Sequence, residues 1–142
     1  MKKILFLICL VNVINTSAQD LLEIDNRLLF RFSENQLGDI VSLNPSQIKF
    51  LNFFLDNSYY FLDAGIIPDQ KLQDYQDVFQ QLSLPSGYQL QEPISKDNFN
   101  ILMFNVPFFE NKSTAYLFGD SNLLLVLRSK KVINEMFNEN DY

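Results

Sequence analysis

Apolar side chains crowd residues 46–57 so closely that only a narrow polar stripe is left on a helical wheel. A helix that is apolar over most of its circumference is normally buried by its neighbours. The polar positions are Lys49, Asn52 and Asp56, and the aromatic positions are Phe50, Phe53 and Phe54. We therefore predict a buried helix here, with its phenylalanines in the core.

The start of this helix is marked by "NPSQ", in which Asn44 is the expected N-cap and Pro45 the first helical residue. Upstream, Ser33 and Gln36 have the spacing of a capping box, which predicts a short helix through Val41. Residues 20–32 fit a helix or a strand, and the helical spacing is favoured slightly.

The clearest amphipathic pattern covers residues 69–82. Apolar residues recur there at intervals of three, four and three, and polar residues fill the opposite face. The apolar positions are Leu72, Tyr75, Phe79 and Leu82. The spacing predicts a surface helix with one face against the core.

Strand patterns dominate the second half of the chain. The predicted strands are residues 99–106, 114–118 and 123–128, with shorter candidates at 58–64 and 88–91. The "GDSN" sequence at 119–122 indicates a hairpin, and Ser129 is the expected N-cap of a final short helix. Since the strands are apolar on both faces, we expect helices to cover at least one of them.

The order of these patterns predicts an α+β fold: N-terminal helices, then a small antiparallel sheet of three to four strands, then a short C-terminal helix. The first 18 residues resemble a cleavable Sec-type signal, with Lys2 and Lys3 before an apolar run and Ala18 at the cleavage position. An uncleaved anchor is the alternative, but the run is short for a membrane span. Residues 19–142 then form one compact domain, bacterial in origin and periplasmic or secreted.

Composition narrows the possible partners and chemistry. Without Lys2 and Lys3, the 11 basic residues fall to 9 against 17 acidic ones. This balance disfavours nucleic acid and permits a basic protein partner. After signal cleavage we expect no membrane span. The only cysteine, Cys9, lies in the signal, so the mature chain needs a core that holds without disulfides.

The chain contains no histidine, which excludes Ser-His-Asp and Cys-His catalysis and the usual zinc sites. We expect no cofactor, no metal site and no identifiable catalytic residue. Catalysis by a pair of carboxylates remains possible. Residues 120–122 could bind calcium through their oxygen atoms, but a tight hairpin turn explains them equally well. The carboxylate candidates are Asp63, Asp69, Asp74, Asp77, Glu92, Asp97 and Glu110. Asp74 and Asp77 would share one face of the predicted helix, where a solvated surface explains them.

Four aromatic residues are candidates for binding: Phe108, Phe109, Tyr88 and Tyr60. Phe108 and Phe109 fall in the "VPFFENKS" loop, where adjacent apolar residues indicate a contact patch unless one ring tucks inward. Tyr88 follows a turn, and strand alternation would turn one of Tyr59 and Tyr60 outward. Lys130 and Lys131 open the last helix against its dipole, which is compatible with a contact surface.

Two functions are consistent with these patterns. The first is an exported, non-enzymatic module that binds a protein or a small apolar ligand. The alternative is a carboxylate-based hydrolase that acts on glycans of the cell envelope or outside the cell.

Overall fold

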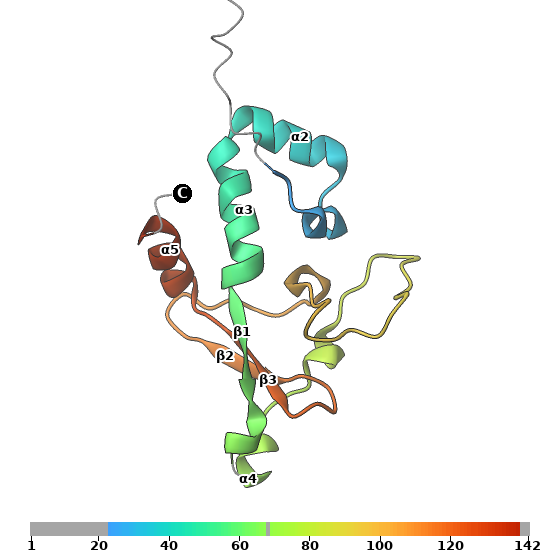
Figure 1. Ribbon diagram of the computed structural model, residues 1–142, viewed down its shortest axis with the longest axis vertical. Helices are drawn as coiled ribbons and strands as arrows, with labels where there is room; N and C mark the ends of the chain where they lie inside the picture. The colour runs from blue at the N-terminus through green and yellow to red at the C-terminus, as the bar shows by residue number, and fades with distance from the viewer. Residues whose placement is uncertain (1–22, 68, 140–142) are drawn as a thin grey trace, which may run out of the picture.

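The computed structural model describes residues 23–67 and 69–139. The elements, with η for a 3-10 helix, are η1 (Asn26–Phe30), α2 (Glu34–Leu43), α3 (Pro45–Asn57), β1 (Tyr59–Asp63), η2 (Ala64–Ile66), α4 (Asp69–Leu72), η3 (Val78–Gln81), η4 (Ile101–Met103), β2 (Thr114–Leu117), β3 (Leu123–Leu127) and α5 (Lys130–Glu139). Helices precede an antiparallel sheet and a short helix ends the chain, which confirms the predicted α+β class (Figure 1). The predicted signal at residues 1–18 lies outside the described residues.

The described sheet has three antiparallel strands in the order β1-β3-β2. The predicted hairpin is present between β2 and β3, with Tyr116 opposite Leu125. On the other side of β3, Leu125 is opposite Phe61 of β1. β1 continues directly from α3, so this edge strand joins the helical end of the molecule to the hairpin of β2 and β3 (Figure 1).

The two faces of β3 belong to two apolar clusters. Leu125 and Leu127 face the main core, and Leu124 and Val126 face a smaller cluster on the other side. Both faces are therefore covered, as the apolar strand sequences indicate. We expected helices to provide this cover, and α2 and α3 do contribute to the main core, together with 3-10 turns and irregular segments.

The main core is rich in aromatic rings, and Phe99 lies at its centre. Its ring centroid lies 4.7 Å from that of Tyr59, 5.5 Å from that of Phe61, 5.1 Å from that of Phe104 and 5.6 Å from that of Phe118. Most of these pairs meet edge to face, which is a favourable geometry for aromatic rings. The cluster joins the sheet to the irregular segment that crosses its inner face.

The prediction of one helix over residues 69–82 is wrong. α4 ends at Leu72, and η3 begins only at Val78. Between them the carbonyl oxygen of Gln76 accepts a hydrogen bond from the backbone N–H of Leu117, at 2.8 Å. The Asp77 carboxylate accepts from the backbone N–H of Phe79 at 2.9 Å and of Gly119 at 3.3 Å. These bonds stabilise an extended segment beside β2, in competition with a continuous helix.

The predicted strands at residues 99–106 and 88–91 are also absent from the described sheet. Asn100 explains the first case: its side-chain oxygen accepts from the N–H of Leu102 at 3.0 Å and so caps η4. Its amide nitrogen donates to the carbonyl oxygen of Arg27 at 3.1 Å. Residues 88–91 form part of an exposed loop without strand pairing.

The segment at residues 20–32, for which the sequence left helix and strand open, forms neither an α-helix nor a strand in its described part. It forms the short 3-10 helix η1, which Asp25 caps. The capping box of Ser33 and Gln36 is confirmed at the start of α2. Asn44 does precede α3, as predicted, but its side-chain oxygen accepts from the hydroxyl of Ser46 instead of capping a backbone N–H.

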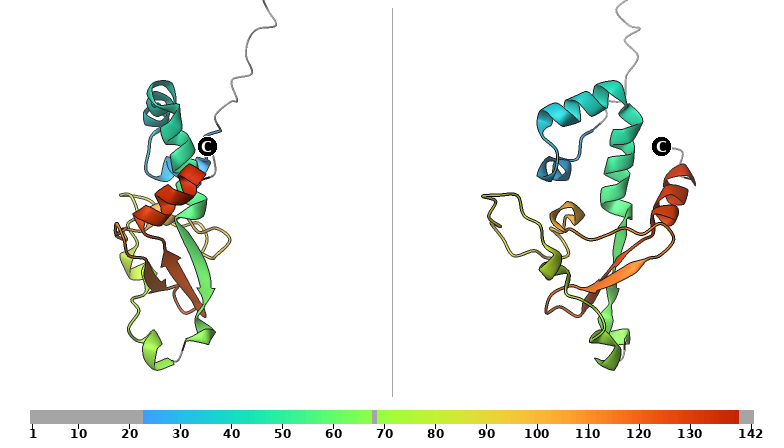
Figure 2. Two further views of the ribbon diagram at one scale, coloured as in Figure 1. Left: turned by 90° about the vertical axis from the view of Figure 1, so that its left-hand side faces the viewer. Right: turned by 180° about the vertical axis from the view of Figure 1, so that it is seen from behind.

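The helices α3 and α5 lie side by side (Figure 2). The Phe137 ring of α5 meets Phe50 at 5.2 Å and Phe53 at 5.3 Å between centroids. Phe53 is buried, as predicted, whereas Phe50 and Phe54 are only half-buried. Part of the apolar circumference of α3 therefore stays open to solvent. None of the helices in the described residues is both long enough and apolar enough to span a bilayer.

Candidate functional site

The loop that contains Phe108 and Phe109 separates the two rings. The Phe108 ring packs against Phe54 at 5.1 Å between centroids, whereas Phe109 is 47% exposed. The loop backbone is held by α5: the carbonyl oxygen of Phe109 accepts from the N–H of Lys130 at 2.9 Å, and that of Glu110 from Lys131 at 3.0 Å. The first turn of α5 thus places Phe108 beside α3.

This placement creates an apolar groove between α3, α5 and the loop. It has a volume of about 330 Å³. We call it the Phe108 groove, and its lining residues are Phe50, Phe54, Phe108, Lys130, Ile133 and Asn134. Its walls are three half-buried phenylalanine rings and the buried Ile133 side chain. An apolar pocket with a few polar groups is the usual form of a small-molecule site.

The polar side of the Phe108 groove comes from α5. Lys130 and Asn134 are separated by one helical turn and are therefore on the same face. Both residues are exposed. Within the described residues Lys130 forms no ion pair, whereas its neighbour Lys131 lies 3.8 Å from Glu135. A cation with no acidic partner among the described residues thus adjoins an apolar groove.

The other two aromatic candidates lie elsewhere. The Tyr60 ring is on the outer side of β1, with the Arg128 guanidinium 4.8 Å from its centroid. Arg128 also donates to the carbonyl oxygens of Asn57 at 2.8 Å and Tyr59 at 2.9 Å. Tyr59 points inward, as alternation requires, and burial raises the pKa of its phenol. The contacts of Tyr60 with Arg128 help to cover the edge of β1.

Tyr88 lies in the exposed loop after η3, with its ring edge-on to Phe30 at 5.2 Å between centroids. It lines a recess of about 260 Å³ with Leu90, Ile94 and Met103 among others. Tyr60, Tyr88 and Phe108 therefore mark three separate places, and of the four candidates only Phe108 lines the apolar groove between α3 and α5.

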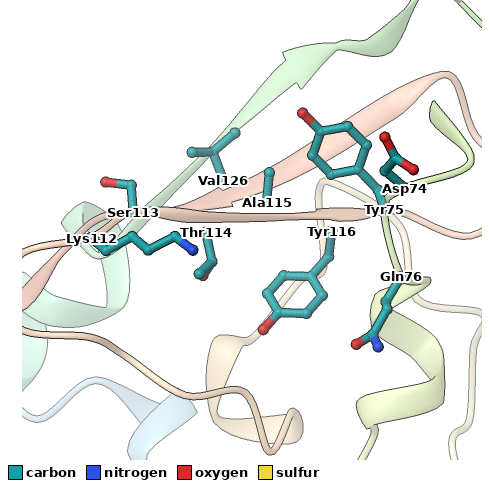
Figure 3. Close-up of a pocket in the computed structure, with 9 residues that line it drawn as sticks. All are labelled: Asp74, Tyr75, Gln76, Lys112, Ser113, Thr114, Ala115, Tyr116 and Val126. Atoms are coloured by element: carbon teal, nitrogen blue, oxygen red, sulfur yellow. The ribbon is translucent and has the colours of Figure 1, made fainter. Parts of the chain in front are cut away.

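A larger recess of about 480 Å³ lies along β2 (Figure 3). Its lining residues are Asp74, Tyr75, Gln76, Lys112, Ser113, Thr114, Ala115, Tyr116 and Val126. The Tyr75 ring lies on the same side of the strand as Ala115 and Val126, and Tyr116 points to the opposite side (Figure 3). The recess follows β2, which is an edge strand of the described sheet, and polar residues make up much of its wall, so it lacks the apolar enclosure of the Phe108 groove.

Several carboxylates have structural partners instead of facing a common site. Asp63 accepts from the N–H of Gly65 at 2.8 Å and from the Asn122 amide at 3.2 Å. Asp77 caps η3, and because helix 69–82 is absent, Asp74 and Asp77 do not share a helix face. Asp74, Glu92, Asp97 and Glu110 are exposed. Within residues 23–67 and 69–139, no three acidic side chains gather as metal ligands would.

The carboxylates of Asp25 and Asp56 are both bound to Arg27. Its guanidinium lies 2.6 Å from an oxygen of each. The hydrogen bond from Arg27 is the main reason that the pKa of Asp25 is lowered. A general acid for glycoside hydrolysis needs the opposite shift, because it must stay protonated near neutral pH.

Comparisons with protein-family models, curated proteins and solved structures found no match to this chain. The site must therefore be interpreted from its own residues. Sequence reasoning identified Phe108 and singled out Lys130, but it assigned Phe50 and Phe54 to the core and did not connect them with the loop. The sequence feature that could have indicated the groove is the helix at residues 46–57, which has more apolar surface than one set of neighbours can cover.

Proposed function

We propose that this protein is an exported, non-enzymatic binding module that holds a small apolar ligand in the Phe108 groove. The observation that supports this most strongly is the groove itself, in which three phenylalanines from two distant segments converge around an open apolar volume of about 330 Å³. Small-molecule pockets start at about 300 Å³, so the groove suits one compact ligand or one alkyl chain.

A small ligand fits these dimensions better than a protein partner does. Stable protein interfaces bury more than about 1,000 Å², and they need a broad complementary surface. A hydrolase receives less support, since Asp63, Asp77, Asp25 and Asp56 already form the turn caps and ion pairs described above.

The test is titration of the purified chain with N-phenyl-1-naphthylamine, a neutral apolar dye that fluoresces when it is shielded from water. We expect saturable binding, and Phe108→Ala should weaken it at least about tenfold, because a wall of the site is removed. The protein should be recovered from the periplasm or medium of the producing cells. Its mass, measured by mass spectrometry, should equal that of a chain that begins at Gln19.

Phe109→Ala is the matched control, because Phe109 is adjacent in sequence but does not line the groove. Thermal unfolding of both variants checks that they are folded. Equal affinities of the dye for Phe108→Ala and the wild-type protein would refute this function, as would an equal loss with Phe109→Ala.

A further inference from the structure

The polar groups at one end of the Phe108 groove indicate which class of ligand the groove would bind. The inference that follows rests on the function proposed above. Lys130 supplies a positive charge at the groove that no described acidic group neutralises. Asn134, one turn later, supplies an amide with no hydrogen bond to another described residue. A ligand that carries a negative charge beside an apolar body would satisfy both groups.

The backbone of α5 limits which anion this can be. The N–H groups of Lys130 and Lys131 donate to the loop carbonyl oxygens of Phe109 and Glu110. The next two N–H groups bind Ser129: that of Val132 donates to the hydroxyl at 3.4 Å and that of Ile133 to the carbonyl oxygen at 3.1 Å. All four donors of the first turn are therefore occupied.

Phosphate sites at helix ends usually rely on several free backbone N–H groups, or on the bidentate fork of arginine. Neither is available at this groove. A lysine ammonium is a compact point charge on a flexible stem, and an amide adds one neutral donor. Two such groups match a carboxylate, which has two oxygens and one negative charge.

We propose that the Phe108 groove binds an amphiphilic monocarboxylate, such as a fatty acid. Its alkyl chain lies among Phe50, Phe54, Phe108 and Ile133, and its carboxylate accepts hydrogen bonds from Lys130 Nζ and Asn134 Nδ2. The positive end of the α5 dipole adds to the attraction even though its N–H groups are occupied.

The experiment compares ligands with the same chain and different head groups. Decanoate, decan-1-ol and decyl phosphate, each below its micelle concentration, compete with N-phenyl-1-naphthylamine for the full chain at pH 7. We expect decanoate to bind about tenfold more tightly than decanol, since a hydrogen bond to a charged group is stronger than one between neutral groups. Decyl phosphate should show no advantage over decanoate.

Lys130→Gln should remove the preference for decanoate, because it should weaken decanoate binding much more than decanol binding. Lys131→Gln is the matched control, because Lys131 lies in the same first turn of α5 as Lys130 but pairs with Glu135 and does not line the groove. It should retain the preference. Asn134→Ala should reduce the preference partially.

The outcomes separate this inference from the function on which it rests. If decanoate and decanol bind equally to the wild-type protein, or if Lys130→Gln keeps the preference, the carboxylate assignment is wrong while a groove for apolar ligands still stands. A clear preference for decyl phosphate would also overturn it. If neither the dye nor any alkyl ligand binds, the proposed function itself fails.

Discussion

Gly119 turns the chain between β2 and β3 with a φ of 58°, in the left-handed region that side chains disfavour. A Cβ atom at this position would also lie 2.9 Å from Cε2 of Phe79. Gly38 differs in both respects, because it lies within α2 and a Cβ atom there would meet nothing within 4 Å. The two glycines should therefore respond to alanine in opposite ways.

We expect Gly119→Ala to lower the free energy of unfolding by about 1–3 kcal/mol, through backbone strain and displacement of the Phe79 ring. Gly38→Ala should raise it by about 0.5–1 kcal/mol, because glycine is a poor residue for a helix interior. Urea unfolding followed by circular dichroism measures both. A neutral or stabilising Gly119→Ala would contradict the turn geometry.

Single residues were predictable where their partner is close in sequence. Ser33 and Gln36 bind each other's backbone across three residues, and the capping-box pattern describes that exchange completely. Asp77 was missed as a structural residue because one of its partners, the N–H of Gly119, is 42 positions away. No local pattern contains such a partner.

The polar stripe of α3 holds the N-terminal segment instead of facing only solvent. The Asn52 amide donates to the carbonyl oxygen of Glu23 at 2.5 Å, and its oxygen accepts from the N–H of Asp25 at 3.3 Å. Asp56 shares the Arg27 guanidinium with Asp25. These bonds attach η1 to α3.

Acid should loosen this attachment. Because the pKa of Asp25 is lowered in the folded protein, its contribution to stability is complete above its ordinary pKa of 3.8 and is lost as pH falls through the lower folded value. We expect Asp25→Asn, which can still cap η1, to lower the urea midpoint at pH 7 but much less at pH 2.5.

The same measurement on Asp97→Asn provides the control, since Asp97 is exposed and has no ion pair within the described residues. Its effect on the urea midpoint should not change with pH. If the deficit of Asp25→Asn were as large at pH 2.5 as at pH 7, the charge of Asp25 would not be the cause.

At the scale of elements, prediction succeeded for α3 and failed for residues 69–82. Both segments have a helical pattern, but α3 begins with a proline at its first position and buries Ile48, Phe53 and Leu55 against its neighbours. In the second segment, the edge of β2 offers Gln76 a hydrogen bond, from the N–H of Leu117, that a helix would forgo. A periodic pattern cannot reveal such a competing strand edge.

The whole molecule is connected through Phe99, whose ring contacts residues of β1 and the ends of both η4 and β2. Phe99 is 4% exposed. Because these contacts join segments from both halves of the chain, residues 23–139 should unfold together. The single compact domain stays a prediction that unfolding experiments can test.

We expect one cooperative urea transition, with coincident curves from far-UV and near-UV circular dichroism. Phe99→Ala should destabilise the protein by about 3–5 kcal/mol, a large part of the total stability of a small domain. Phe109→Ala, an exposed control, should change stability by less than about 1 kcal/mol. Two separate transitions in the wild-type protein would contradict a single domain.

The amino-acid sequence alone determined the α+β class, the capping box at Ser33, the helix after Asn44 and the hairpin at residues 119–122, because each depends on neighbours within a few positions. It also placed Phe108 in a loop and Lys130 at the start of a helix. Only the tertiary structure decided that Phe50, Phe54 and Phe108 line one groove beside Lys130. The groove depends on contacts between segments more than 50 residues apart, such as that of Phe54 with Phe108, and a local periodic pattern cannot predict such contacts.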